Sequence, residues 1–137
     1  MDTRCDICHY RSENTSHILW ECPFAQNVWA LMSSRIQKCK NMANDFFQLF
    51  RQVRDRLTQR ELEQWAITAW SIWNARNRFY FEHVQHQPKA IVDVACGLLE
   101  EYQRLMALQQ KSTVFFSVFL LHICIGLVLQ CCISFYF

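Results

Sequence analysis

The stretch CDICHYRSENTSHILWEC, residues 5–22, concentrates cysteine and histidine near the start of the chain. Two residues separate Cys5 from Cys8, so both thiolates can turn toward one point, and the apolar Ile7 can cover the turn. Four residues separate His17 from Cys22, which would leave them about 140° apart on an α-helix. Cys22 must therefore lie near a helix end, and the proline that follows it favours a break there.

Four side chains of this stretch form a complete tetrahedral Zn2+ shell, namely Cys5, Cys8, His17 and Cys22. A shell with no open position is typical of a structural site and not of a catalytic one. Unrelated thiols beside a surface histidine are the alternative, but an HxxxxC that closely follows a CxxC favours metal. His9 and Cys39 are substitute ligands, although His9 would be strained in the same shell as its neighbour Cys8.

The composition of the chain changes sharply near its end. Its 137 residues, about one domain in length, include 14 basic and 12 acidic ones, and every one of these precedes residue 113. The chain has eight cysteines, yet its first residues, MDTRCDICHYRSEN, lack an apolar run resembling a signal peptide. We therefore expect reduced thiols, for which clustered Cys and His favour metal over disulfides.

Apolar spacing of three and four residues predicts an all-α body. We expect a helix over 25–37 begun by Pro23, a second over 44–57, a third opened by a Thr58–Glu61 capping box, and a fourth led by Pro88. The expected core residues are Phe24, Val28, Leu31 and Met32; Phe46, Phe47, Phe50, Val53 and Leu57; Leu62, Trp65, Ala66, Ala69, Trp70 and Trp73; and Ile91, Val94, Ala95, Leu98, Tyr102 and Leu105. We expect Arg76, Asn77 and Arg78 to form a polar helix end.

Charge and motifs narrow the function classes. The net charge of +2 alone favours neither nucleic acid nor membrane. Residues 35–60 carry a basic excess that we interpret as solvated helix surface, with phosphate contact as the alternative. Its basic residues are Arg35, Lys38, Lys40, Arg51, Arg54, Arg56 and Arg60. The sequence has no GxSxG, HExxH or phosphate-binding glycine loop, so we expect no enzyme activity.

Residues 5–29 resemble part of the zinc-binding domain that follows reverse transcriptase in plant non-LTR (LINE-type) retrotransposon polyproteins. That pattern is CxxC, eight residues, HxxxxCPF, and then VW. It is matched by Cys5, Cys8, His17, Cys22, Pro23, Phe24, Val28 and Trp29, with Glu13 and Thr15 at its usual acidic and threonine positions. Residues 65–102 are similar to the connector before RNase H in the same polyproteins, through Trp70, Trp73, Arg76, Asn77, Phe81 and Pro88.

The resemblance implies a structural zinc site and a segment that lies between two enzymes. Only four residues precede Cys5 and no acidic residue follows Glu101, so we expect neither polymerase nor RNase H activity. We divide the chain into a partial zinc-binding domain (1–34), a helical connector (35–112) and a hydrophobic tail (113–137). Nucleic acid is the first candidate partner, through the zinc knuckle and the basic stretch 35–60.

The tail, TVFFSVFLLHICIGLVLQCCISFYF, supports a competing interpretation. As a helix, 113–137 would extend about 37 Å, longer than the ~30 Å hydrocarbon core of a bilayer. The alternative function is therefore a tail-anchored membrane protein whose helical cytosolic body binds a protein partner. Without insertion we expect the cytoplasm or nucleus, and a third hypothesis is a retrotransposon remnant with no selected function.

Overall fold

The structure is a computed structural model that describes residues 4–38 and 46–109. Its elements are a π-helical turn, η1 (His17–Glu21), and the helices α1 (Pro23–Trp29), α2 (Ser34–Gln37), α3 (Phe46–Arg56), α4 (Gln59–Glu82) and α5 (Pro88–Gln109). The two described ranges contain no strand, only an isolated bridge between Arg4 and Ser12. The expected all-α fold is therefore confirmed for this part of the chain.

The hydrophobic helix expected over 113–137 lies outside the described residues. Within the ranges 4–38 and 46–109, no helix is both long enough and apolar enough to cross a membrane.

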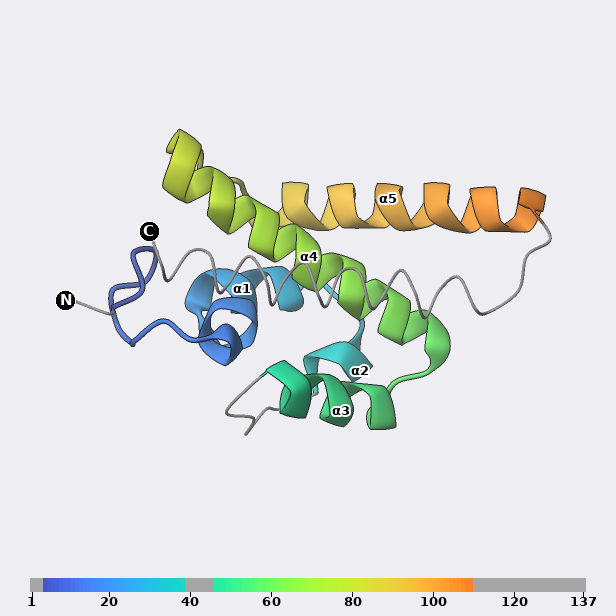
Figure 1. Cartoon of the computed structure of the whole chain (residues 1–137), viewed down its shortest axis with the longest axis horizontal. Coiled ribbons are helices and arrows are strands. Elements are labelled where there is room, and N and C mark those ends of the chain that lie inside the picture. The colour runs from blue at the N-terminus through green and yellow to red at the C-terminus, as the bar shows by residue number, and fades with distance from the viewer. Residues whose placement is uncertain (1–3, 39–45, 110–137) are drawn as a thin grey trace.

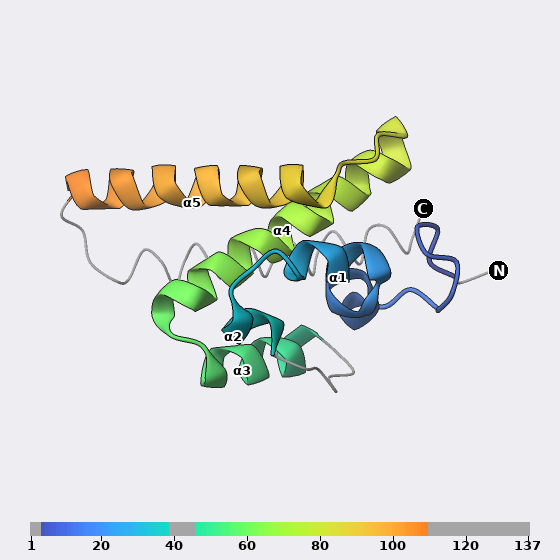
Figure 2. The same cartoon turned by 180° about the vertical axis from the view of Figure 1, so that it is seen from behind.

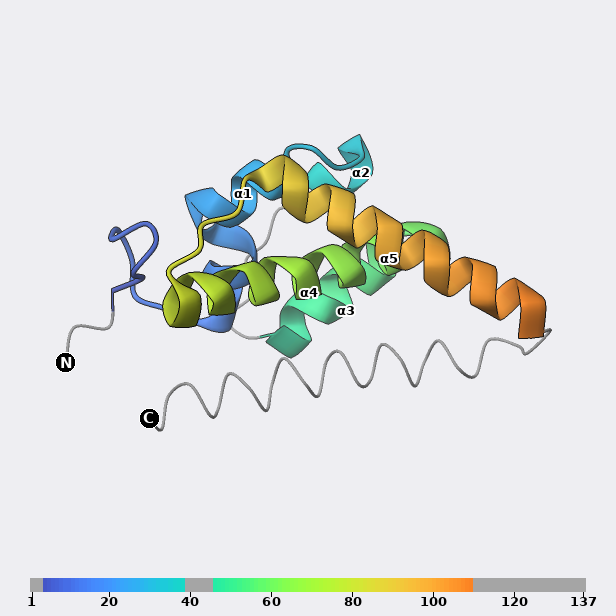
Figure 3. The ribbon, with the colours of Figure 1, turned by 90° about the horizontal axis from the view of Figure 1, so that it is seen from above.

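The central element is α4, the longest helix (Figure 1). On one side of it packs α5, whose last turns extend past the other helices, and on the opposite side lie α2 and α3 (Figure 2). The view from above shows α5 crossing α4 at an angle, so that α1 lies beside the beginning of α5 (Figure 3). The π turn η1 contacts α4, and Cys5 and Glu13 of the N-terminal loop contact Arg76 in the second half of this helix, which brings the cysteine-rich stretch onto α4.

The ends of α4 follow local rules. At its start the Thr58 hydroxyl accepts a hydrogen bond from the Glu61 backbone N–H, and the Glu61 carboxylate accepts one from the Thr58 backbone N–H at 2.9 Å. This confirms the expected capping box. At its end His83 adopts a left-handed conformation, φ 56°, and its N–H bonds the Phe79 carbonyl at 3.1 Å. Such a cap lets the chain reverse toward α5.

One aromatic group joins the N-terminal segment to α4. The Trp29 ring stacks on Trp65 with centroids 6.2 Å apart, and Trp20 and Phe50 flank the pair at 4.7 and 6.4 Å. The indole N–H of Trp29 donates to the Leu19 carbonyl at 2.8 Å, which satisfies its polar atom inside the core. The predicted core positions on α4 are confirmed: Leu62, Trp65, Ala66, Ala69 and Trp73 are buried and Trp70 is half-buried.

The prediction of a single helix over 25–37 is wrong. This segment forms two helices, α1 and α2, with a break between them. The Gln37 side-chain amide donates to the carbonyls of Ala30 at 3.0 Å and Met32 at 2.7 Å, which are left without helical partners at the break. Ser33, with ψ 149°, then leads into α2. Leu31, expected in the core, is consequently exposed.

The core residues predicted for α3 and α5 include several that are exposed in the structure. Phe47 is exposed in α3, where Leu49, absent from our expected core, is buried beside the predicted Val53. In α5 the buried residues are Ile91, Ala95 and Leu99, whereas Val94, Leu98 and Leu105 are exposed. The reason is geometric: α5 packs on the body through one narrow face, so that apolar residues beside this face remain in contact with solvent.

Candidate metal centre

Local hydrogen bonds shape the loop that carries Cys5 and Cys8. The Cys5 N–H donates to the Arg11 carbonyl at 2.8 Å, and the His9 N–H donates to the Cys5 carbonyl at 2.7 Å. His9 takes a positive φ of 59°, which reverses the chain directly after Cys8. Both thiols thereby face the same side of the loop, the geometry that a CxxC pair requires.

A π-helical turn carries the other two predicted ligands. The Cys22 N–H donates to the His17 carbonyl at 2.7 Å, five residues back, and Asn14 accepts from the His17 N–H through its side chain at 2.8 Å. A bond from i to i+5 sets the two residues on one side of the turn, whereas an α-helix would separate them. On an α-helix, the HxxxxC spacing would point His17 and Cys22 in different directions. The π-helical turn and the break before Pro23 remove this difficulty.

The four predicted side chains lie together. The sulfurs of Cys5 and Cys22 are 3.9 Å apart, Cys8 Sγ is 3.3 Å from His17 Nε2, and all four donor atoms lie within 4.8 Å of one another. Cys5, Cys22 and His17 are buried and Cys8 is half-buried. A disulfide needs sulfurs about 2.05 Å apart, so Cys5 and Cys22 are free thiols. This cluster could bind a metal ion.

Of the two substitute ligands, His9 does not enter the cluster. His9 is exposed and is not among the residues brought together, and Cys39 lies outside the described residues. The remaining thiol in the described ranges, Cys96, is exposed on α5 and also lies apart from the four.

The environment of the cluster shifts its ionisation. Burial, and then the charge of Arg76, lower the pKa of His17, so its imidazole is neutral at neutral pH, as a metal ligand requires. Burial raises the pKa of the Cys22 thiol to about 11. Burial also opposes ionisation of Cys8, but hydrogen bonds led by the Tyr10 backbone bring its pKa below the ordinary value. A bound cation would favour the thiolate form of all three cysteines.

The expected polar helix end at 76–78 is wrong for Arg76, whose side chain is only 2% exposed. Its Nη2 donates to Cys5 Sγ at 3.4 Å and its Nη1 lies 3.7 Å from Cys22 Sγ. Arg76 also forms a short ion pair with Glu13, which accepts a hydrogen bond from the Tyr80 hydroxyl. Burial, with the Glu13 charge, raises the pKa of Tyr80, so the phenol stays protonated and donates.

Sequence reasoning missed this contact, although a signal was present. Trp65, Ala69, Ile72 and Arg76 follow one another at spacings of four, three and four, so position 76 continues the buried face of α4. Because arginine rarely enters a core without a partner, its place on this face indicates a buried anion. The residue type alone suggested a solvated end.

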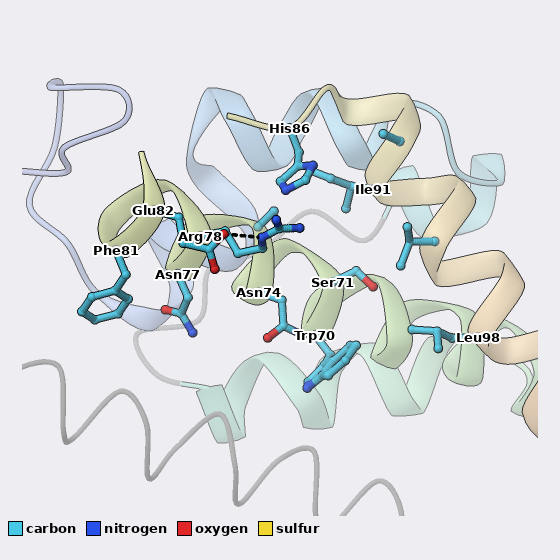
Figure 4. Close-up of a pocket in the computed structure, with 13 residues that line it drawn as sticks. Trp70, Ser71, Asn74, Asn77, Arg78, Phe81, Glu82, His86, Ile91 and Leu98 are labelled. Atoms are coloured by element: carbon cyan, nitrogen blue, oxygen red, sulfur yellow. Dashed lines mark hydrogen bonds and ion pairs between the residues drawn. The ribbon is translucent and has the colours of Figure 1, made fainter. Parts of the chain in front are cut away.

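A cavity of about 440 Å³ lies between the second half of α4 and the first half of α5 (Figure 4). Its walls are mostly apolar, with an ion pair between Arg78 and Glu82 at 2.9 Å. Ser71 and His86 both line it, but Ser71 Oγ and His86 Nε2 have no hydrogen-bond partner in the part of the chain that is described. They therefore do not form the hydrogen-bonded pair that activates a serine nucleophile.

Comparisons of the chain with protein-family models, with curated proteins and with solved structures find no match.

Proposed function

We propose that this chain is a non-catalytic, zinc-stabilised module derived from the zinc-binding region of a LINE-type retrotransposon polyprotein. The observation that carries the proposal is the convergence of Cys5, Cys8, His17 and Cys22, with donor atoms within 4.8 Å of one another. Three sulfurs and one imidazole nitrogen leave no position for a reacting water, which favours a structural role for the metal.

The spacing of the donor atoms supports zinc as the metal. With Zn–S of about 2.3 Å and Zn–N of about 2.0 Å, tetrahedral geometry puts two sulfurs about 3.8 Å apart and a sulfur and a nitrogen about 3.5 Å apart. The corresponding distances are 3.9 Å for Cys5 and Cys22 and 3.3 Å for Cys8 and His17. Thiolate-rich tetrahedral sites favour zinc over the oxygen-seeking cations magnesium and calcium.

The proposed origin rests on the sequence pattern. The four ligands, the CPF that follows and the VW after it all agree with the retrotransposon motif. Pro23 of this pattern begins α1, and Trp29 stacks against Trp65 of the connector-like segment. The residues shared with the family thus have structural roles at the cluster and its support.

Metal content tests the function directly. We expect about one zinc per purified chain by elemental analysis, because the described cluster supplies one complete shell. Cys22→Ser should lose most of this zinc, since it removes a buried ligand. Cys96→Ser is the matched control: its thiol is exposed and outside the cluster, so its zinc content should equal that of the parent. A parent without zinc after reconstitution, or a Cys22→Ser variant that keeps it, would contradict the proposal.

Nucleic-acid contact is the second candidate, favoured by exposed basic side chains on the α2–α3 side of the molecule. Lys38, Arg51, Arg56 and Arg60 are exposed, and within the described ranges none of them has an ion-pair partner. Two other arginines of the stretch are paired, Arg35 with Glu61 and Arg54 with Asp55. The unpaired cations leave charge available for phosphate groups.

Salt dependence tests this candidate. We expect single-stranded RNA to bind zinc-loaded protein with an affinity that falls as salt rises, because each phosphate contact releases a counterion. Changing Arg51 and Arg56 together to glutamine should reduce the slope of log affinity against log salt by about 1.4, about 0.7 per lost contact with a single strand. The same change at Arg104, which is ion-paired to Glu101 on α5, is the control. Binding that does not depend on salt would contradict nucleic-acid contact through these residues. Equal slopes for the parent, the Arg51 and Arg56 double variant and the Arg104 variant would contradict it as well.

A further inference from the structure

We infer that Arg76 of α4 is a positioning residue of the metal centre, which holds the sulfurs of Cys5 and Cys22 at ligand spacing and makes metal affinity depend on this helix. The inference rests on the proposed zinc site and adds a residue that supplies no ligand atom. Arg76 is separated from Cys5 by 71 positions in the sequence and from Cys22 by 54.

The guanidinium geometry suits this role. A planar fork can direct two N–H groups at two acceptors at once, and here Nη2 reaches Cys5 Sγ at 3.4 Å while Nη1 faces Cys22 Sγ at 3.7 Å. These are the two fully buried sulfurs of the cluster. The half-buried Cys8 lies instead beside His17. Arg76 thus holds the Cys5 and Cys22 sulfurs. The N-terminal loop and the π turn place the other two donors, Cys8 and His17.

Charge explains why an arginine occupies a buried position there. Three thiolates and one divalent cation leave a centre with one net negative charge, and the Glu13 carboxylate adds a second beside it. The Arg76 guanidinium lowers this total from two negative charges to one. Buried charges are tolerated when they are paired and hydrogen-bonded, and N–H groups bonded to thiolate sulfur stabilise the anionic ligand. An apolar side chain at position 76 would leave this negative centre unbalanced in the core.

Two further residues fix the orientation of the Arg76 guanidinium. Glu13, on the loop between the cysteine pair and the π turn, forms an ion pair with Arg76 through Nη2. The Tyr80 hydroxyl, one turn further along α4, donates to the same Glu13 oxygen. The carboxylate is therefore held between two α4 side chains, so that the loop that carries Cys5 and Cys8 is tied to α4 independently of the metal. Partners of this kind outside the ligand shell fix ligand geometry in metal sites.

The test measures zinc affinity and cobalt spectra in the full-length protein. In Arg76→Lys, which keeps the charge but loses the fork, we expect zinc affinity to fall about 10- to 100-fold in competition with a chromophoric chelator. The sulfur-to-cobalt charge-transfer band of the Co2+-loaded variant should move to longer wavelength, since thiolates that lose N–H donors are more easily oxidised. Arg78→Lys is the matched control, because Arg78 is exposed and pairs only with Glu82 among the described residues.

Milder variants keep the test decisive if Arg76→Lys fails to fold. Glu13→Gln and Tyr80→Phe leave Arg76 in place and loosen its support, so both should weaken zinc binding and shift the cobalt band less than Arg76→Lys. Unchanged affinity and an unchanged band in every folded variant would overturn the inference while leaving the zinc site intact. A parent that binds neither zinc nor cobalt would instead overturn the proposed function.

Discussion

Chelation of the metal is expected to abolish most of the cooperative stability of this protein. The four proposed ligands bring the N-terminal loop and η1 together in a region with little other regular structure. Apparent binding free energies of structural zinc in small modules are about 10–16 kcal/mol, comparable with the whole unfolding free energy of a typical domain, about 5–15 kcal/mol. We therefore expect helical circular dichroism to fall and the melting transition to broaden or disappear after treatment with a strong chelator, and to return when zinc is restored.

The Cys22→Ser variant provides the control for this experiment. Because this variant lacks a complete shell, its helical signal should be low at the outset and chelator should change it little. The exposed Cys96→Ser variant should respond as the parent does. A parent whose melting temperature is the same with and without chelator would show that the fold does not depend on the cluster.

Truncation of Trp65 to alanine is expected to lower the unfolding free energy of the zinc-loaded protein by about 3–5 kcal/mol. This side chain is 2% exposed, the largest fully buried one in the described ranges, and contacts the rings of Trp29 and Phe50. Its removal leaves a cavity between the N-terminal segment, α3 and α4, and a close-packed interior closes over such a cavity only in part. The midpoint of urea unfolding, followed at constant zinc concentration, measures the loss.

Phe81→Ala is the matched control for the core, since it also removes a large aromatic from α4 but at a position that is 79% exposed. Its effect should remain within about 0.5 kcal/mol. If the two variants unfold at the same urea concentration, the Trp29–Trp65 contact contributes little and the N-terminal segment is not packed on α4 in solution.

The Cys/His cluster could be predicted from the sequence because it depends on local spacing. The CxxC pair needs only a tight turn, and the HxxxxC pair follows it closely, so Cys5, Cys8, His17 and Cys22 were identified together. The α4 helix was predictable for the same reason, since the Thr58–Glu61 capping box and the tryptophan spacing are contained within it. In both cases, the residues that fix the structure are close in the sequence.

Features that depend on distant contacts were not predictable. The spacing along α4 indicates that Arg76 is buried, but its contact with Cys5 joins positions 71 residues apart, and no local pattern identifies this partner. The narrow packing face of α5 is set by the helices it meets, so apolar spacing could not show that Leu98 and Leu105 remain exposed. The break between α1 and α2 is a local feature, in which the Gln37 amide bonds the Ala30 and Met32 carbonyls. It was missed because helix propensity and apolar spacing favoured one continuous helix.

The π turn has a consequence for how the gene can vary. A hydrogen bond from Cys22 to His17 closes over five residue steps, so the length of this interval is fixed more tightly than its composition. We expect half-buried Glu21 to tolerate replacement more readily than buried Leu19. Insertion of a single codon between His17 and Cys22 would give a spacing of six residues, which leaves the two side chains about 120° apart on an α-helix. We therefore expect an in-frame insertion there to be more damaging than most missense changes.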